Sequence, residues 1–116
     1  MNKKIVFTVL SVIYLIILFI GAFAVKAGNI SKASNFDKVL HFFGFLILAI
    51  LLLVTFEHYK LGNKYVSVFI IALGIGILIE AIQLFIPGRE FSLLDILADV
   101  LGVIVGLLLT WSFSKR

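Results

Sequence analysis

The residues from Glu80 to Gly106 read EAIQLFIPGREFSLLDILADVLGVIVG, and they decide how the rest of the chain is interpreted. The stretch holds the end of one apolar run, a short turn at Pro87-Gly88, and the start of a second apolar run. Polar side chains interrupt both runs, namely Glu80, Gln83, Asp95 and Asp99. A charged group in hydrocarbon costs on the order of several kcal/mol, so such groups usually face a protein interior or a water-filled cavity. The stretch therefore predicts a helical hairpin that carries a polar site.

Apolar runs of this kind fill the whole chain of 116 residues, which is 63% hydrophobic and 14% charged. A helix of about 20 residues crosses a hydrocarbon core of about 30 Å, and backbone groups in lipid must be satisfied within their own segment. We therefore predict one all-α integral membrane domain over residues 1–116, a four-transmembrane-helix bundle with short loops. The expected helices cover about residues 5–25, 38–57, 65–86 and 91–113.

The basic residues beside these runs predict the orientation of the bundle. Of the 10 Lys and Arg residues, six would lie on the side of the termini: Lys3, Lys4, Lys60, Lys64, Lys115 and Arg116. The other four would lie opposite: Lys26, Lys32, Lys38 and Arg89. Because Lys and Arg favour the cytoplasmic side, both termini are expected in the cytoplasm. A cleaved signal peptide ending at Ala22-Phe-Ala24 is the alternative, but the first run exceeds the roughly 7–15 apolar residues typical of such peptides.

Composition also excludes some function classes. The chain has no cysteine, so it has no disulfide, thiolate metal site or cysteine nucleophile. Its net charge of +4 comes mostly from residues that flank the runs, and no basic stripe with interleaved aromatic residues predicts nucleic-acid binding.

Helical spacing gathers the polar residues of different runs at one depth. Asp37 and His41 share a face of the second helix, Glu80 and Gln83 share a face of the third, and Asp95 and Asp99 share a face of the fourth. We predict a polar pit open to the outside, with Lys38 and Arg89 near its mouth. Packing at four glycines would close it below: Gly44, Gly76, Gly102 and Gly106. The last two form a G-x-x-x-G, which allows helices to approach closely.

Several smaller expectations follow from position alone. Phe42, Phe43 and Phe45 lie near a helix start, and most of them are expected to belong to an interfacial aromatic belt. His58 falls in a polar connection and is expected to be solvated, and Gly74 is expected to let another helix approach. The spacing D-x3-H-x2-G from Asp37 is echoed as D-x3-D-x2-G from Asp95, which we interpret as coincidence.

These residues resemble the VanZ-like family of small bacterial membrane proteins. The resemblance is carried by Asp37-Lys38-x2-His41-Phe42, Glu80-x2-Gln83, Pro87-x-Arg89, Ser92-x2-Asp95 and Gly102-x3-Gly106. It covers roughly two-thirds of the chain, and the family usually has Asn at the position of Asp99. The founding member is associated with resistance to the glycopeptide antibiotic teicoplanin. The resemblance implies a multi-pass protein of the bacterial cell membrane that works near cell-wall precursors or lipids at the outer face.

The favoured function is binding of an anionic head group, on a membrane lipid or a lipid-linked cell-wall precursor, with an indirect effect on glycopeptide susceptibility. Lys38, Arg89 and His41 would attract the anion, and the acids would orient them. The predicted ligand-binding residues are Asp37, Lys38, His41, Glu80, Gln83, Arg89, Asp95 and Asp99. No oligomeric state is implied.

Three alternatives stay open. An enzyme acting on a lipid-linked substrate would use His41 or Glu80 for acid–base chemistry, but no familiar catalytic motif is present. A transporter is disfavoured because the first helix carries no charged residue inside the membrane. The charged residues could also be an ion-paired cluster that only fixes the bundle. No cofactor or metal is predicted; a hard divalent metal held by His41 and carboxylates is the less favoured possibility.

Overall fold

The computed structural model describes residues 2–27, 35–60, 62–85 and 92–114, and every regular element within them is an α-helix. The helices are α1 (Lys3–Ala27), α2 (Asn35–His58), α3 (Lys64–Gln83) and α4 (Leu93–Ser114). Each contains a segment long and apolar enough to cross a membrane. The all-helical architecture with four candidate spans is therefore confirmed.

The helix ends follow from local backbone chemistry. α3 stops at Gln83, before the predicted end at residue 86, because the chain tightens into a turn at Leu84 and Phe85. Their N–H groups donate to the carbonyls of Ala81 and Ile82, three residues back, at 3.3 and 3.0 Å. Such tightening satisfies carbonyls that a helix end would otherwise leave without a donor.

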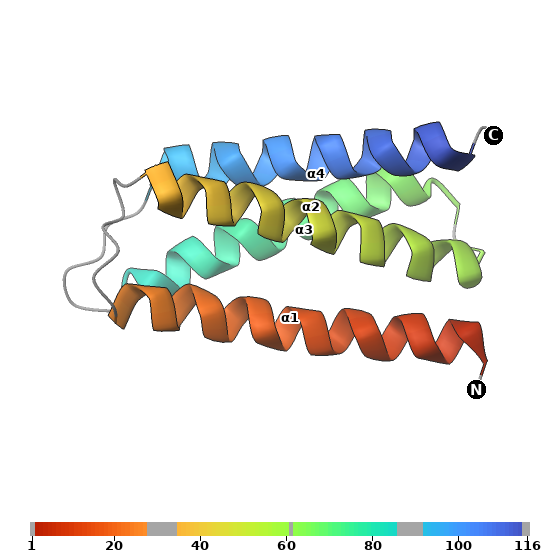
Figure 1. Ribbon diagram of the computed structural model, residues 1–116, viewed down its shortest axis with the longest axis horizontal. Helices are drawn as coiled ribbons and strands as arrows, with labels where there is room; N and C mark the ends of the chain where they lie inside the picture. The colour runs from red at the N-terminus through yellow and green to blue at the C-terminus, as the bar shows by residue number, and fades with distance from the viewer. Residues whose placement is uncertain (1, 28–34, 61, 86–91, 115–116) are drawn as a thin grey trace.

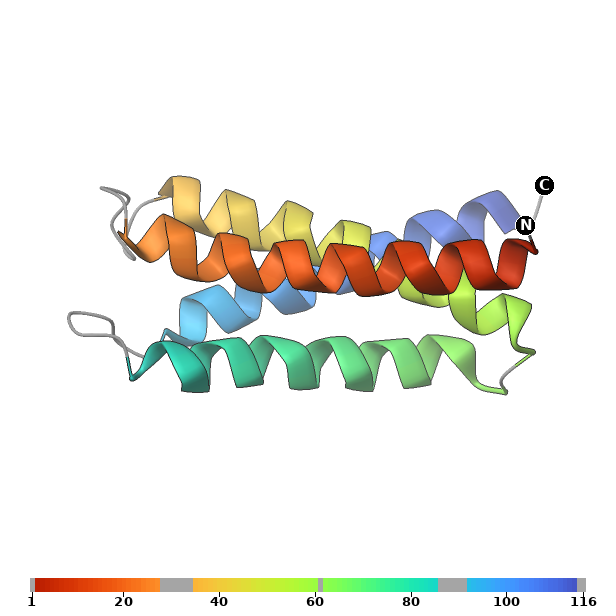
Figure 2. The same cartoon turned by 90° about the horizontal axis from the view of Figure 1, so that it is seen from below.

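The helices alternate in direction, so α2 and α4 run the same way (Figure 1). The start of α1 and the end of α4 lie at one end of the bundle. The other end, where α1 and α3 finish and α2 and α4 begin, is called the polar end below. α2 contacts all three other helices, and its most extensive contact is with α4. Figure 2 shows α1 and α3 as two separate helices that both run along the length of the bundle.

Two glycines on α4 explain the close contact between α2 and α4. A Cβ added at Gly102 would overlap the backbone carbonyl of Phe42, and one added at Gly106 would lie 2.7 Å from the carbonyl oxygen of Leu46. Both glycines are buried. The G-x-x-x-G thus lets the backbones of two parallel helices touch, as small residues do in membrane helix packing.

The apolar core lies mostly on α2. Its fully buried members are Phe45, Leu48, Ala49, Leu52, Leu53, Val68, Ala72, Ile79 and Val103. In contrast, α1 keeps a broad apolar face exposed, for example at Ile16 and Ile20. A helix in lipid needs no polar outer face, so this exposure fits a surface that contacts acyl chains.

Polar groups fasten α1 to α2 along its inner side. Tyr14 donates its hydroxyl hydrogen to the carbonyl of Gly44, with 2.6 Å between the oxygens. The hydroxyls of Ser11 and Thr55 are 2.9 Å apart, and both residues are buried. Hydrogen bonds of this type contribute to helix association where lipid supplies little hydrophobic driving force.

Several local expectations were wrong. Of the three phenylalanines, most of which were expected in an interfacial belt, Phe43 is exposed but Phe45 is 2% exposed and belongs to the core. His58 ends α2 instead of lying in a loop, and its half-buried ring stacks on Phe7 with 5.2 Å between ring centroids. Gly44 faces Leu18 and Tyr14 of α1, and Gly74 has no described atom within 4 Å of an added Cβ. In these cases the sequence indicated how far along its helix a residue lies, but not which neighbouring helix that residue faces.

Candidate functional site

Five predicted residues meet at the polar end, on the first turns of α2 and α4. They are Asp37, Lys38, His41, Asp95 and Asp99, and they are called the polar cluster below. Both helices begin at this end and run in parallel, so equal depth along them brings the side chains together. The spacing of four residues within each helix then places both members of a pair on one face.

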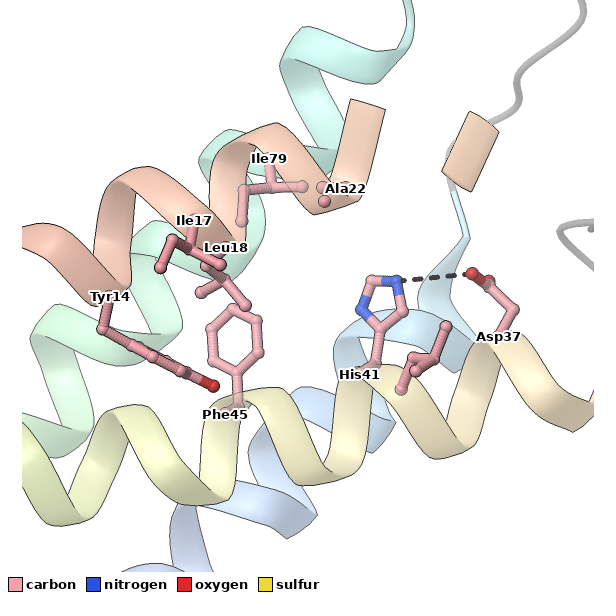
Figure 3. A pocket seen from close by; sticks show the side chains of 10 residues that line it. Tyr14, Ile17, Leu18, Ala22, Asp37, His41, Phe45 and Ile79 are labelled. Carbon is pink, nitrogen blue, oxygen red and sulfur yellow. Dashed lines mark ion pairs between the residues drawn. The ribbon is translucent and has the colours of Figure 1, made fainter. Parts of the chain in front are cut away.

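His41 lies at the centre of the polar cluster. Its Nδ1 is 2.7 Å from Oδ1 of Asp99, a hydrogen bond between α2 and α4. Its Nε2 lies 3.6 Å from Oδ2 of Asp95 and 3.9 Å from Oδ1 of Asp37. Figure 3 shows the histidine ring turned toward Asp37. An ionised carboxylate only accepts hydrogen bonds, so an ionised Asp99 requires the proton on Nδ1.

Lys38 supplies the permanent positive charge of the cluster. Its Nζ lies 2.6 Å from Oδ1 of Asp95 and 3.9 Å from Oδ2 of Asp37. The two oxygens of the Asp95 carboxylate thus face different basic residues: Oδ1 faces Lys38 and Oδ2 faces His41. A short contact to a buried carboxylate is the strong kind of charge-assisted hydrogen bond.

The acids of the cluster are buried and its cations are more accessible. The side chains of Asp37, Asp95 and Asp99 are 4%, 0% and 3% exposed, against 22% for Lys38 and 10% for His41. Three carboxylates therefore stand behind one lysine and one histidine. Among the described residues of the cluster, the acids remain in excess even when His41 is protonated.

Gly76 of α3 makes room for this arrangement. A Cβ at Gly76 would lie 2.8 Å from Oδ2 of Asp99, so a larger residue would displace the carboxylate that holds His41. From the sequence, Gly76 was predicted only as one of four glycines whose packing closes the polar pit. Its pairing with Asp99 follows from how α3 crosses α4, which spacing along α3 does not encode.

Glu80 is close to the polar cluster but has another contact. Its Oε1 accepts the backbone N–H of Ser92, with 2.9 Å between the atoms, just before the start of α4. The hydroxyl oxygen of Ser92 in turn accepts the N–H of Asp95 at 3.2 Å. In a usual capping box the acid at Asp95 would accept the Ser92 N–H itself. Because Glu80 does so from α3, the Asp95 carboxylate is left to face α2.

Gln83 and Arg89 complete the set of predicted site residues. Gln83 is buried and donates from Nε2 to the carbonyl of Ala22 at 3.0 Å, which ties α3 to the last turns of α1. This hydrogen bond gives Gln83 a role in the packing of α3 against α1. Arg89 lies outside the described residues.

An apolar cavity of about 200 Å³ lies between α1, α2 and α3 and reaches the polar cluster at one end. Asp37 and His41 line that end, as Figure 3 shows. The remaining lining residues are Tyr14, Ile17, Leu18, Gly21, Ala22, Leu40, Phe45 and Ile79. The sequence did not indicate this cavity; the hydroxyl of Tyr14, one of the few polar groups within α1, was the available signal for a polar contact there.

Comparison with known proteins identifies the family of the chain. The family model described as VanZ/LLP1 matches residues 3–114. An uncharacterized protein of Schizosaccharomyces pombe, C11E3.10, is 31% identical over 104 residues, which cover 90% of this chain and 64% of the relative. The chain thus spans slightly less than two-thirds of that relative's length. No solved structure matches the chain. The matched range includes all four helices and the whole polar cluster, and the chain belongs to the VanZ/LLP1 family.

Proposed function

We propose that this protein binds one anionic amphiphile in the membrane, with the head group at the polar cluster and the first part of the apolar chain in the adjoining cavity. The observation that carries the proposal is the asymmetry of the cavity. Asp37 and His41 line one end, and apolar side chains line most of the rest. Ligand sites commonly combine apolar walls with a few convergent polar groups.

The order of exposure in the cluster supports an anionic head group. A ligand that arrives at the polar end meets Lys38 and His41 before the acids, because those two side chains are the most exposed of the cluster. The buried carboxylates behind them orient the cations. Lysine is a common point contact for phosphate. Arginine is suited to bidentate contacts with phosphate, and Arg89, which follows α3 in sequence, is the residue predicted to supply one.

Two sources would supply such a ligand: an anionic phospholipid and a polyprenyl-phosphate cell-wall precursor. Both present phosphate on an apolar chain. A relative in a yeast favours the phospholipid, because peptidoglycan precursors are bacterial. A precursor ligand would instead connect the site to altered glycopeptide susceptibility. With either source, we place the polar end outside the cell membrane and both termini in the cytoplasm.

Photo-crosslinking in nanodiscs of zwitterionic lipid tests the proposal and separates its sources. The protein is offered a photoactivatable phosphatidylglycerol in one arm and a photoactivatable polyprenyl phosphate in the other. Crosslinks are expected at Ile17, Leu18 and Leu40. Lys38→Gln should weaken binding about tenfold, the effect of losing about 1.4 kcal/mol. Labelling by a zwitterionic probe that equals labelling by both anionic probes would contradict the anionic head group.

A matched pair of glycine variants tests the cavity itself. An added Cβ meets no described atom within 4 Å at Gly21, which lines the cavity, or at Gly74, which does not. Gly21→Leu should fill the cavity and abolish specific crosslinking, whereas Gly74→Leu should leave it unchanged. Equal crosslinking in both variants would remove the cavity from the binding site.

A membrane enzyme is the second candidate function, supported by the 2.7 Å hydrogen bond from His41 to Asp99. A histidine oriented by a carboxylate is a common form of general base. This candidate predicts that His41→Gln still binds the crosslinking probe but no longer converts it. Mass spectrometry of the probe after incubation with wild-type protein would show whether any conversion takes place.

A further inference from the structure

We infer that Asp37, His41 and Asp95 form a site for a divalent first-row metal ion. One ligand atom from each residue lies within 4.8 Å of the other two. The separations from Nε2 of His41 are 3.6 Å to Asp95 and 3.9 Å to Asp37. Donors at about 2.0–2.2 Å from one ion lie roughly 3.0–3.6 Å from each other. The two distances from Nε2 are within a few tenths of an ångström of that range, and the two carboxylates would move together around the ion.

The hydrogen bond to Asp99 supplies the second, independent observation. A metal-binding histidine usually gives its other ring N–H to a carboxylate, which fixes the tautomer and turns the free lone pair toward the ion. Here Asp99 contacts Nδ1, so a neutral His41 that donates from Nδ1 to an ionised Asp99 carries its lone pair on Nε2. Nε2 is aimed at two carboxylates but lies beyond hydrogen-bonding distance of both, and the His41 side chain is only 10% exposed. A cation between these three atoms could be coordinated by Nε2 and by one oxygen of each carboxylate.

The two oxygens of Asp95 allow the ion and Lys38 to be bound together. Lys38 contacts Oδ1, whereas Oδ2 faces His41. The lysine charge nevertheless lies near the ion and opposes its binding. Lys38 therefore lowers the affinity without blocking the site, and its removal should strengthen binding. A cluster that serves only as a structural ion pair predicts no such gain.

The donor set indicates the class of ion. One imidazole nitrogen and two carboxylate oxygens suit Zn²⁺ or Mn²⁺ better than the softer ions that select thiolates. Because Asp37 and His41 line the cavity, an ion held by them would be accessible from the cavity. In a step that rests on the proposed function, a phosphate oxygen of the head group would fill an open coordination position of the ion. The ion would then explain how an acid-rich cluster accepts an anion.

Cobalt titration in detergent, without added lipid, tests the site separately from the proposed function. The protein carries a tag without histidine and is first stripped with a chelator. Co²⁺ should produce visible d–d bands that Zn²⁺ abolishes by competition. His41→Ala and Asp95→Asn should lose the bands, and Asp99→Asn should weaken binding by about 10–100-fold. Lys38→Gln should tighten it. His58→Ala and Glu57→Gln are the matched controls, because both residues lie at the opposite end of α2.

A second variant, His41→Cys, tests the metal site even if another variant folds poorly. The chain has no cysteine, so His41→Cys would introduce the only thiolate. A sulfur-to-cobalt charge-transfer band in that variant would place the ion at position 41 directly. The inference is overturned if wild-type protein shows no d–d bands, or if the bands persist unchanged in folded His41→Ala. Lipid crosslinking that survives this result would leave the binding proposal intact.

Discussion

His41 of α2 and Asp99 of α4 occupy matching positions on two parallel helices, and their side chains meet at 2.7 Å. They are 58 residues apart, the same offset that separates Asp37 from Asp95. The similar spacing of polar residues after Asp37 and after Asp95 was interpreted as chance from the sequence. In the structure, these two stretches lie side by side and contact each other. Two parallel helices in register bring equivalent positions to one level, so a repeated spacing of polar residues produces a compact cluster.

Asp99 should be required as a hydrogen-bond acceptor more than as a charge. Asp99→Asn keeps an oxygen for Nδ1 of His41 and should unfold in micelles at nearly the wild-type temperature. Asp99→Leu leaves that donor buried without its partner and should cost about 1–3 kcal/mol. Thermal unfolding monitored by circular dichroism compares the two. A loss in Asp99→Asn as large as that in Asp99→Leu would mean that the charge itself is needed.

Contact between α2 and α4 should tolerate no side chain at Gly102. Gly102→Ala forces its Cβ into the carbonyl of Phe42, and overpacking of this kind typically costs about 1–3 kcal/mol. Gly74→Ala, where the space is open, should be neutral or slightly stabilising because alanine is the better helix former. Unfolding temperatures of the two variants in the same detergent provide the measurement. A neutral Gly102→Ala would show that the two helices are farther apart than described.

Glu80 should act as a backbone acceptor and not as an acid–base group. Glu80→Gln retains an oxygen for the Ser92 N–H, so both stability and ligand binding should be retained. Glu80→Leu removes the acceptor and should cost about 0.5–2 kcal/mol, the range of a lost helix cap. Unfolding and crosslinking are measured on each variant. Loss of activity in a well-folded Glu80→Gln would favour the enzyme candidate.

Cysteine labelling should establish the orientation, since the chain contains no cysteine of its own. Asn63→Cys lies between α2 and α3, on the side of the termini, and should be protected from an impermeant maleimide added to whole cells. Asn29→Cys lies between α1 and α2 and should react. The opposite pattern would place the polar end in the cytoplasm and would rule out an outward-facing site.

Expression in a glycopeptide-sensitive Gram-positive host separates the two ligand sources in cells. If the ligand is a cell-wall precursor, the wild type should raise the minimal inhibitory concentration of teicoplanin, and His41→Ala, Arg89→Ala and Gly21→Leu should not. Membrane levels are matched by immunoblot, with Gly74→Leu as the control that keeps the effect. An unchanged concentration with the wild type would direct attention to the phospholipid.

The number of helices and the location of the polar cluster could be predicted because both depend on periodicity. Helical spacing placed Asp37 and His41 on one face, and Asp95 and Asp99 on another, at a common depth. The partners of Glu80 and Gln83 could not be predicted, because both bind backbone atoms whose positions depend on how helix ends meet. Phe45 was misplaced for a related reason. Its position near the start of α2 indicates the membrane interface, but its direction toward α1 and α3 decides its burial.

The parallel pairing of α2 with α4 has a consequence for how the protein is made. α2 leaves the ribosome with Asp37, Lys38 and His41 already in place, while the helix that carries their partners has not yet been synthesised. If the helices enter the bilayer one hairpin at a time, Lys38 and His41 of α2 enter before the carboxylates of α4 are available to them. A nascent chain halted before α4 would therefore expose these groups within the membrane. That defect is one a membrane-embedded protease or chaperone could recognise, and α4 would act as the check that the protein has been finished.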